Sequence, residues 1–491
     1  MKQLNGECYL KRIFLACLLI FTILLIAACE NVEYPEDASS LAPEASEDIY
    51  EKIESELPPP VEESNGEVKK QEFIIATDKK AAFINEEGKS GSINKAIDKR
   101  NDFLYDTYGA EIKVVEVTSA DLTKSLKESL ESGLHYCDMI AVSAKETVKL
   151  MNAGLLSDMN NLPGFNAESG YFDRKNVLSL ATNSSLYMIG DPTAQYYEEE
   201  FVMFYNRDIV VKNANQNPEA LALQGKWTWD SFNEVARASA PDVYQHSTSD
   251  LDRDVFGFGA YYNENSFAHV MWAGAGNKMI SNTYKSPVAL SMSVEEVQAA
   301  AKPLRDAYNS RGRLPLEGES VVTAFKTDRL AFMVHKFSYF YTLRNEKPEK
   351  YGFLPIPKIS EQQTDYNCLL STDARVISIP KSVDYQSDAK KRFISVIISA
   401  TCATGKDTVE KAFINEHIGT YLYTNEETVL LTMICEAATF DFSNVYGSVI
   451  SEIRRPTTDA IADYIEFGSA LSSSISRTIG AFNKYSAEKF K

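Results

Sequence analysis

The chain has little of the patterning that marks a catalytic or metal centre. Its five histidines show neither H-x-x-x-H nor H-E-x-x-H spacing, which argues against a zinc protease. It contains no G-x-S-x-G motif and no phosphate-binding glycine loop. Lysine and arginine form no cluster, and the net charge of −19 argues against nucleic acid as a partner. We therefore expect no catalytic residue, no metal and no cofactor.

Two weaker patterns bear on other kinds of site. Asp250, Asp252 and Asp254 alternate as in the first half of a calcium loop, but Val255 occupies the position that requires glycine. This replacement argues against calcium. A carboxylate pair for glycoside hydrolysis stays open, because acids are plentiful and their separation depends on the fold.

Cysteine is scarce and scattered. Cys137, Cys368, Cys402 and Cys435 lie singly along the body of the chain, with no metal-ligand spacing. Their even number permits two disulfides in an exported protein, but a body of this size does not need them. We expect free, buried thiols.

Only one long hydrophobic run occurs, at residues 13–28, directly after Lys11 and Arg12. Its 16 residues fall short of the roughly 20 that cross a bilayer as a helix. A positive start, an apolar stretch and small residues at its end are the parts of an export signal. The final I-A-A-C resembles the bacterial lipobox, in which a lipid is attached to the cysteine thiol. We expect a lipoprotein signal peptide at 1–28 and lipidation of Cys29; an uncleaved signal anchor is the alternative.

Much of the acidic charge lies in one segment. Residues 30–66 hold 12 acids and one lysine, a net charge of −11, together with five prolines. Such a composition cannot bury enough apolar surface to fold, and its charges repel one another. We expect residues 29–69 to be a disordered acidic tether that holds the body away from the membrane.

From residue 70 the chain alternates between short apolar runs and segments with a helical period. The expected strands are 72–77, 112–117 and 138–142, and the expected helices are 92–108, 121–133 and 145–153. This alternation predicts an α/β fold with a parallel sheet. Ligands of such sheets bind beyond the carboxyl ends of the strands, where Asp78, Ser143 and Ala144 lie.

Thr228 precedes the run W-D-S-F and is suited to cap a helix, because its hydroxyl can accept a hydrogen bond from a free amide. Asp230 would complement the positive end of the same helix. Trp227 and Trp229 flank this start, where aromatic residues usually pack against the turn. We interpret both as packing residues; sugar stacking is the alternative.

Six short motifs follow one another through the body of the chain. They are C-D-M-I at 137–140 with A-G-L-L-S-D at 153–158, F-Y-N-R-D at 204–208, Q-G-K-W-T-W-D-S-F at 224–232, V-F-G-F-G at 255–259, F-K-T-D-R-L-A-F-M at 325–333 and Y-G-F-L-P-I-P at 351–357. Their order resembles the extracellular solute-binding lipoproteins of bacterial ABC importers, in the branch similar to maltose- and oligosaccharide-binding proteins. The resemblance runs from about residue 72 to the C-terminus.

That resemblance implies a two-lobed periplasmic-binding-protein fold of type II, with α/β lobes that are discontinuous in sequence and joined by a hinge. Lobe one would take residues 70–180 and 372–425, and lobe two residues 181–371 and 426–491. Pro355 and Pro357 force an extended segment, which suits a strand that leaves one lobe for the other.

The resemblance also implies a function and a set of binding residues. The protein would be a lipid-anchored, extracytoplasmic monomer that captures a small, carbohydrate-like solute by cleft closure and delivers it to the permease of an ABC importer. The candidate ligand-binding residues lie in loops at the cleft: Asp78, Tyr196, Glu264, Ser266, Phe267, His335, Phe337 and Tyr339. For each of them the alternative is a solvated loop residue or a packed aromatic side chain.

One departure from the family bears on the solute. Sugar binders often carry a stacking tryptophan in the loop after A-F-M, and this chain has Phe337 and Tyr339 there instead.

Two other functions share these motifs or stay compatible with them. One is a ligand sensor for a membrane signalling kinase, and the other is a surface glycoside-active enzyme.

Overall fold

The computed structural model describes residues 57, 68–85, 90–183, 185–190, 193, 195–213, 217–245, 250–281, 288–462 and 469–489. These residues all belong to one unit that extends from Glu47 to Lys491. The expected signal peptide, Cys29 and nearly all of the expected tether lie outside the described residues. Within the tether, Leu57 is described and is buried in a hydrophobic core.

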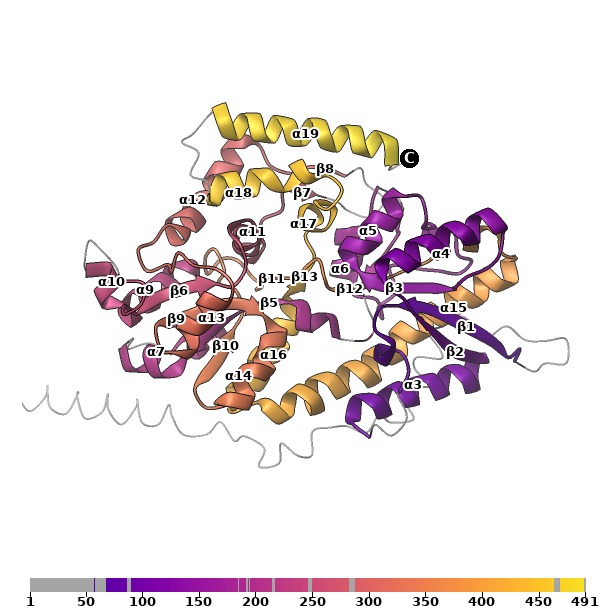
Figure 1. Ribbon diagram of the computed structural model, residues 1–491, viewed down its shortest axis with the longest axis horizontal. Helices are drawn as coiled ribbons and strands as arrows, with labels where there is room; N and C mark the ends of the chain where they lie inside the picture. The colour runs from indigo at the N-terminus through magenta and orange to yellow at the C-terminus, as the bar shows by residue number, and fades with distance from the viewer. Residues whose placement is uncertain are drawn as a thin grey trace, which may run out of the picture. The chain divides into compact units, whose positions relative to one another are not determined.

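The first sheet has five strands in the order β2-β1-β3-β12-β4 (Figure 1). Its strands are β1 (Gln71–Thr77), β2 (Ala110–Glu116), β3 (Met139–Ser143), β4 (Ile189–Gly190) and β12 (Arg375–Ser378). β1 pairs in parallel with β2 and β3, which confirms the three expected strands and their parallel arrangement. β12 is antiparallel to β3 and β4, because the chain re-enters this sheet from the second sheet at the opposite end of the strands.

The helices that follow these strands confirm the expected alternation. The helices of this part are α3 (Ser92–Tyr108), α4 (Ser119–Ser132), α5 (Ala144–Asn152), α6 (Arg174–Leu180) and α15 (Asp388–Gly405). Thr118 and Ser143 cap α4 and α5 by accepting hydrogen bonds from backbone amides three residues on. Leu122 and Leu126 turn the apolar side of α4 into the core. Gly133 ends α4 with a φ of 71°, a conformation that favours glycine.

The second sheet has four strands in the order β10-β5-β9-β6. They are β5 (Phe201–Asn206), β6 (Phe256–Ala260), β9 (Leu330–Lys336) and β10 (Tyr351–Leu354). β5 is antiparallel to β9 and β10, whereas β6 is parallel to β9. The helices of this part are α7 (Arg207–Asn213), α8 (Pro218–Leu223), α9 (Trp229–Ser239), α10 (Pro241–Gln245), α11 (Glu264–Gly274), α12 (Val294–Tyr308), α13 (Glu319–Lys326) and α14 (Phe340–Glu346).

The start of α9 confirms the expected cap. The Thr228 hydroxyl accepts a hydrogen bond from the Ser231 amide, and the Ser231 hydroxyl accepts one from the Thr228 amide. Trp227 and Trp229 are fully buried, and both rings meet Phe232 edge-on. They are packing residues, as we predicted.

Three connections carry the chain between the two sheets. The first runs from β4 through η4 (Gln195–Glu199) to β5, so the first sheet extends past residue 180 to Gly190. The second leads from β11 (Cys368–Leu369) to β12. The third continues α15 through the helical segments η7 (Lys406–Glu410), η8 (Ala412–Ile418) and η9 (Gly419–Tyr421) to α16 (Asn425–Ala437). β13 (Ala438–Thr439) then pairs in parallel with β11.

The C-terminal segment packs against α5 of the first sheet's part and against α11 and α12 of the second sheet's part. It contains α17 (Phe442–Tyr446), η10 (Ser451–Arg454), α18 (Arg455–Ile461) and α19 (Ser469–Lys489). The Tyr446 hydroxyl donates to the Leu180 carbonyl at 3.0 Å, and Lys489 Nζ donates to the Asn152 carbonyl at 2.8 Å. The remaining short elements are η2 (Lys80–Ala82), η3 (Met159–Asn161), β7 (Ile280–Ser281), β8 (Ala289–Leu290), η5 (Phe337–Tyr339) and η6 (Lys381–Tyr385).

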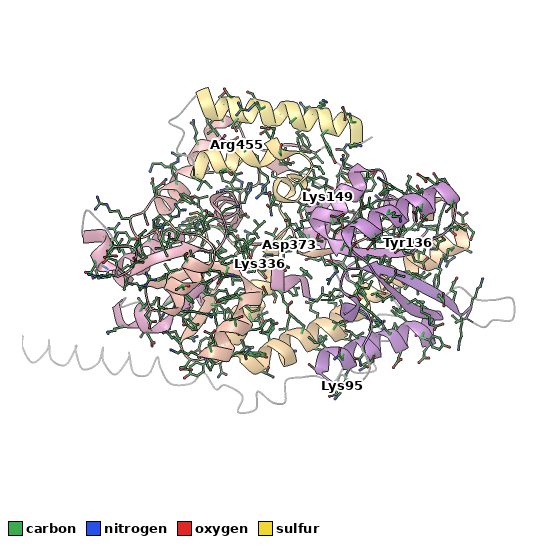
Figure 2. The ribbon with its side chains drawn as sticks, viewed as in Figure 1. Lys95, Tyr136, Lys149, Lys336, Asp373 and Arg455 are labelled. Atoms are coloured by element: carbon green, nitrogen blue, oxygen red, sulfur yellow. The ribbon has the colours of Figure 1, made fainter. Side chains whose placement is uncertain are left out.

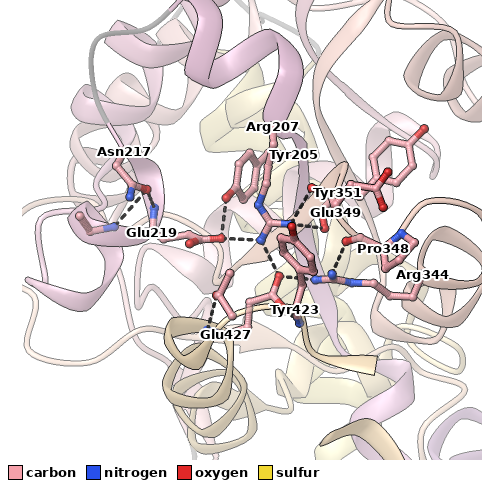
Figure 3. Close-up of polar contacts among 12 residues, drawn as sticks. Tyr205, Arg207, Asn217, Glu219, Arg344, Pro348, Glu349, Tyr351, Tyr423 and Glu427 are labelled. Atoms are coloured by element: carbon pink, nitrogen blue, oxygen red, sulfur yellow. Dashed lines mark hydrogen bonds and ion pairs between the residues drawn. The ribbon is translucent and has the colours of Figure 1, made fainter. Parts of the chain in front are cut away.

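A buried cluster of charges, the Glu427 cluster, fastens α16 to the second sheet (Figure 3). Glu427 forms ion pairs with Arg344 and, at 2.5 Å, with Arg207. Arg207 also pairs with Glu219 at 2.8 Å, and Glu219 accepts a hydrogen bond from the Tyr205 hydroxyl at 2.5 Å. Burial alone would lower the pKa of Arg207, but Tyr205 and the two glutamates outweigh it and raise that pKa. The charges of the cluster are therefore paired with one another.

Within the described part of the chain, no helix is both long and apolar enough to cross a bilayer. No three histidine, cysteine, aspartate or glutamate side chains in that part are placed to hold a metal ion. Cys137, Cys368, Cys402 and Cys435 are free thiols, as predicted; the first three are buried, whereas Cys435 is partly exposed.

Candidate functional site: a charged and aromatic cavity at β9 and β12

Charged side chains gather at one edge of the first sheet. The carboxyl ends of β1 and β3 and the amino end of β12 meet there, as the register of Ser143 with Arg375 requires. Asp78, directly after β1, pairs with Arg375 at 3.3 Å. Lys145, in the first turn of α5, pairs with Asp373, which lies two residues before β12. This is the edge at which open α/β sheets bind their ligands.

Lys336, the last residue of β9, links the second sheet to that edge (Figure 2). Its ammonium lies 2.7 Å from a carboxylate oxygen of Asp373 and 2.6 Å from one of Glu199. Burial alone would raise the pKa of Asp373, but hydrogen bonds from Lys145 and Lys336 outweigh it and hold that pKa at about 2. Likewise burial would lower the pKa of Lys336, and its bonds to Asp373 and Glu199 raise it instead. Asp373 and Lys336 are therefore both charged at neutral pH.

Aromatic rings border these charges. The His335 ring lies 4.5 Å from the Tyr261 ring and 4.4 Å from the Tyr339 ring, between centroids. The Tyr262 ring meets the Phe201 ring edge-on at 5.0 Å. Burial lowers the pKa of His335 to about 4, so its imidazole is neutral at pH 7. The neighbourhood therefore offers ring faces beside fixed charges, the combination that binds the apolar faces and hydroxyl groups of sugars.

A cavity of about 130 Å³, which we name the Lys336 cavity, opens among these groups. It is lined by Phe201, Tyr262, Ser266, Lys336, Leu369, Ser371, Thr372, Asp373, Asn444 and Arg454. The lining combines two rings with hydroxyl, amide, carboxylate and cationic groups. It draws on the second sheet, on the chain that enters β12 and on the C-terminal segment.

A larger cavity, of about 440 Å³, lies at the connections between the sheets and contains Tyr196 and Tyr197 in its lining. Their hydroxyls donate to carboxylate oxygens of Asp173 at 3.4 Å and of Glu410 at 3.3 Å. Burial raises the pKa of both tyrosines and of Glu410. The Lys336 cavity is the better candidate for the solute, because it lies at the carboxyl edge of the first sheet and includes groups from β9.

The structure places the expected site residues in several different settings. Ser266 lines the Lys336 cavity, while His335 and Tyr339 belong to the aromatic group beside it. Asp78 lies at the same sheet edge in its pair with Arg375, and Tyr196 lies in the larger cavity. The side chain of Glu264 lies outside what the structure describes.

Phe267 and Phe337 lie in the hydrophobic core. Phe267 is 2% exposed and packs on Phe258 and Tyr308. Phe337 is 1% exposed and stacks on Phe340 with ring centroids 5.1 Å apart. Both rings fill space between helices and the second sheet, so we do not include them in the proposed site.

Of the ten lining residues only Ser266 was anticipated from the sequence; the other nine include all three charged ones, Lys336, Asp373 and Arg454. Lys336 sits between His335 and Phe337, which we did single out, and this position at the end of β9 was the available signal. Asp373 and Arg454 lie in segments without a distinctive motif. Only the fold brings them to β9.

Comparison with known proteins finds a fold but no close relative. No protein-family model matches the chain, and no curated protein matches it in sequence. Among solved structures, the cyclic α-maltosyl-1,6-maltose binding protein from Arthrobacter globiformis matches with a TM-score of 0.54 and 12% identity, over 86% of this chain and 100% of that one. The maltose-binding periplasmic protein from Listeria monocytogenes in complex with maltose gives 0.51 and 14%, over 86% and 99%. The extracellular solute-binding protein from Staphylococcus aureus in complex with maltose gives 0.51 and 12%, over 85% and 98%.

These matches cover nearly the whole of each solved chain, so they compare complete folds. The chain accordingly has the two-lobed α/β fold of type II that the motifs predicted. One lobe is built on the first sheet and the other on the second. At such low identity the likeness shows the fold, and the solute is a matter for the residues of the cavity.

Proposed function

We propose that this protein is an extracytoplasmic solute-binding protein that captures a small, carbohydrate-like solute and passes it to an ABC importer. The observation that carries the proposal is the composition of the Lys336 cavity, whose lining combines two aromatic rings with hydroxyl, amide and charged groups. Its setting in a fold shared with sugar-binding proteins adds support.

Different cavity residues would contact different parts of a sugar. Tyr262 and Phe201 offer ring surface to the C–H face of a sugar, which is apolar. Ser266, Thr372 and Asn444 offer neutral hydrogen-bonding groups to hydroxyls. None of these roles makes or breaks a covalent bond, so the proposed function is binding rather than catalysis.

The position of the charges supports closure of the two lobes around a solute. Lys336 belongs to the second lobe, whereas Lys145 and Asp373 belong to the first lobe and its entry. A solute that contacts both sides would favour the closed arrangement by its differential affinity for the two states. The closed surface is what a permease would recognise.

In this proposal the N-terminal region determines where the protein is located. A lipid on Cys29 would attach the chain to the outer face of the cell membrane, and the acidic segment up to residue 69 would let a monomeric two-lobed body reach the permease. Replacing Cys29 by alanine should release the protein from the membrane fraction. Retention of the variant in that fraction would contradict lipid anchoring.

The test of binding is a stability screen of the purified chain with mono- and oligosaccharides, and with peptides for comparison. A ligand present at 100 times its dissociation constant adds about 2.7 kcal/mol to the free energy of unfolding. We expect at least one saccharide to do so, without being converted to product. Absence of any stabilising saccharide would contradict the proposal, and turnover of a glycan in the same samples would favour an enzyme.

A transport role and a sensor role differ in the protein partner. We expect the chain, in the presence of its solute, to bind the permease subunits of an ABC importer. Solute-dependent binding to a membrane kinase instead would identify a sensor.

A further inference from the structure

Arg454 ends η10 and lines the Lys336 cavity. Its backbone carbonyl accepts a hydrogen bond from the ring Nε2 of buried His269 at 3.2 Å, which fixes the residue's position. Its aliphatic stem lies against the backbone of Gly447, where a Cβ atom would come within 2.2 Å of the arginine Cδ. The absence of a side chain at Gly447 therefore leaves room for the stem of Arg454, whose side chain lines the cavity.

The Arg454 guanidinium has no partner among the described residues. It forms no hydrogen bond and no ion pair there, and its Nε is shielded from solvent. Other buried arginines are matched: Arg207 and Arg344 both pair with Glu427, and the Nε of Arg305 donates to the Ala460 carbonyl at 2.8 Å. A partly buried cation without a partner is costly, so natural structures rarely keep one without a use.

The other charges at the cavity balance one another. Two lysines, Lys145 and Lys336, face two carboxylates, Glu199 and Asp373, and every one of these four is ion-paired. Arg454 is then the cation in excess. This leaves one positive charge for a group that is not part of the chain.

Asp441 is the acid that acts on Arg454 through space, and it does not form an ion pair with it. Its carboxylate accepts the Asn444 amide at 2.8 Å as the cap of α17. Its charge also acts on Lys278. Burial lowers the pKa of Arg454 and Asp441 offsets part of that effect, yet the guanidinium stays protonated at neutral pH.

An anionic group would pair with the Arg454 guanidinium, which has no partner among the described residues. A guanidinium presents a planar fork of donors that matches a carboxylate or a sulfate ester. Asn444 and Lys336, both in the same lining, add further donors. Tyr262 and Phe201 offer ring faces in the same lining.

From these observations we infer that the Lys336 cavity is a subsite for an anionic group of the solute, held by Arg454, so that the protein selects acidic saccharides such as uronates over neutral ones. This inference rests on the proposed function and narrows its solute class. Arg454 is the specificity-determining residue in it.

The test is calorimetric titration of the full chain with matched saccharides. The pairs are glucuronate with glucose and galacturonate with galactose, each also as the disaccharide, and sodium sulfate and citrate serve as anions without a sugar. We expect the acidic member of at least one pair to bind at least tenfold more tightly than the neutral one. Higher ionic strength should weaken the acidic member more than the neutral one.

Variants assign that preference to the residue. Arg454→Gln should weaken binding of the acidic saccharide about 10- to 100-fold and that of the neutral partner less than threefold. Arg454→Lys, which keeps the charge but not the fork, should lose less. Arg477→Gln is the matched control, because that side chain is 60% exposed and lies 4.0 Å from Glu452. Urea midpoints of all variants establish that each one is folded.

The possible results separate the two claims. Equal affinity for acidic and neutral members, or equal effects of Arg454→Gln and Arg477→Gln, would overturn the anionic subsite and leave the proposed function standing. Tight binding of citrate or sulfate with no saccharide bound would overturn both. Should Arg454→Gln fail to fold, the preference of the wild-type chain and the Arg454→Lys result decide the question.

Discussion

Two groups of buried charges in this protein are built differently. In the Glu427 cluster, Glu427 and Arg344 have side chains that are 0% and 1% exposed, and both arginines of the cluster are paired. In the Lys336 cavity the side chains of Lys336 and Asp373 are 13% and 41% exposed, and Arg454 has no described partner. The charges of the first group are all paired with one another, whereas the second group contains a cation that can take an additional partner.

The difference separates a structural role from a binding role. A buried ion pair whose members satisfy each other specifies one arrangement of the elements that carry it. The Glu427 cluster does this for α16 and the second sheet. Charges that are partly exposed can exchange partners at lower cost, which suits a site that must accept and release a solute.

Breaking the Glu427 cluster should have the largest effect. Glu427→Ala removes the shared partner of Arg207 and Arg344 and leaves two buried cations without it. We expect a loss of about 3–5 kcal/mol in the free energy of unfolding. Urea denaturation followed by circular dichroism measures it.

The control for that variant is the neighbouring Glu426→Gln. Glu426 is exposed, and its replacement should change the free energy of unfolding by less than about 0.5 kcal/mol. Equal effects of the two substitutions would show that the cluster does not stabilise the fold.

The aromatic group beside the cavity should give a pH dependence. Burial lowers the pKa of His335 to about 4, below its value of about 6.5 in an unfolded chain. Its neutral form therefore contributes stability that is present above pH 6.5 and is lost as the pH falls toward 4. We expect His335→Asn to reduce this loss by about 3 kcal/mol, measured as the difference in urea stability between pH 7 and pH 4. Parallel pH profiles for the two proteins would contradict the burial argument.

Removing a ring from the cavity should affect binding more than folding. Tyr262→Ala deletes a ring that is half-buried at the cavity, and we expect solute affinity to fall about 3- to 10-fold. Phe337→Ala, in the core, should instead cost about 3–5 kcal/mol of stability, since it opens a cavity in the packing. Titration and urea unfolding of both variants distinguish the roles. The reverse pattern would place Phe337 in the site and Tyr262 outside it.

The smallest effect should come from Asp373, the partly exposed carboxylate that pairs with Lys145 and Lys336. The pKa of Asp373 is held at about 2, below its unfolded value of about 3.9, so its contribution is present above pH 3.9 and is lost as the pH falls through 2. Because solvent screens this carboxylate, we expect Asp373→Asn to cost at most about 1 kcal/mol at pH 7. The cost should shrink between pH 4 and pH 2. A constant cost over that range would assign it to packing.

Much of the fold was predictable because local patterns agreed with it. The alternation of apolar strands with helical periods predicted the parallel part of the first sheet, and Thr228 predicted the start of α9. The antiparallel strands β4 and β12 were harder to predict from the sequence, because their pairing depends on where the chain returns from the other lobe.

The site was predictable only in part. Ser266 follows the motif at β6 and His335 the motif at β9, and these parallel strands end at the same edge of the second sheet, so both positions could be found. Phe337 has a suitable ring in a suitable loop, but the helical turn η5 directs it into the core. Arg454 lies 118 residues from Lys336 in sequence and meets the cavity only through the course of the C-terminal segment.

The central claim is that a saccharide binds in the Lys336 cavity. Calorimetric titration of the purified chain and of Lys336→Met with the saccharide that stabilises the chain most tests it directly. We predict saturable one-to-one binding to the wild-type chain and a loss of at least tenfold in affinity for the variant. Binding that is unchanged by Lys336→Met would contradict the account.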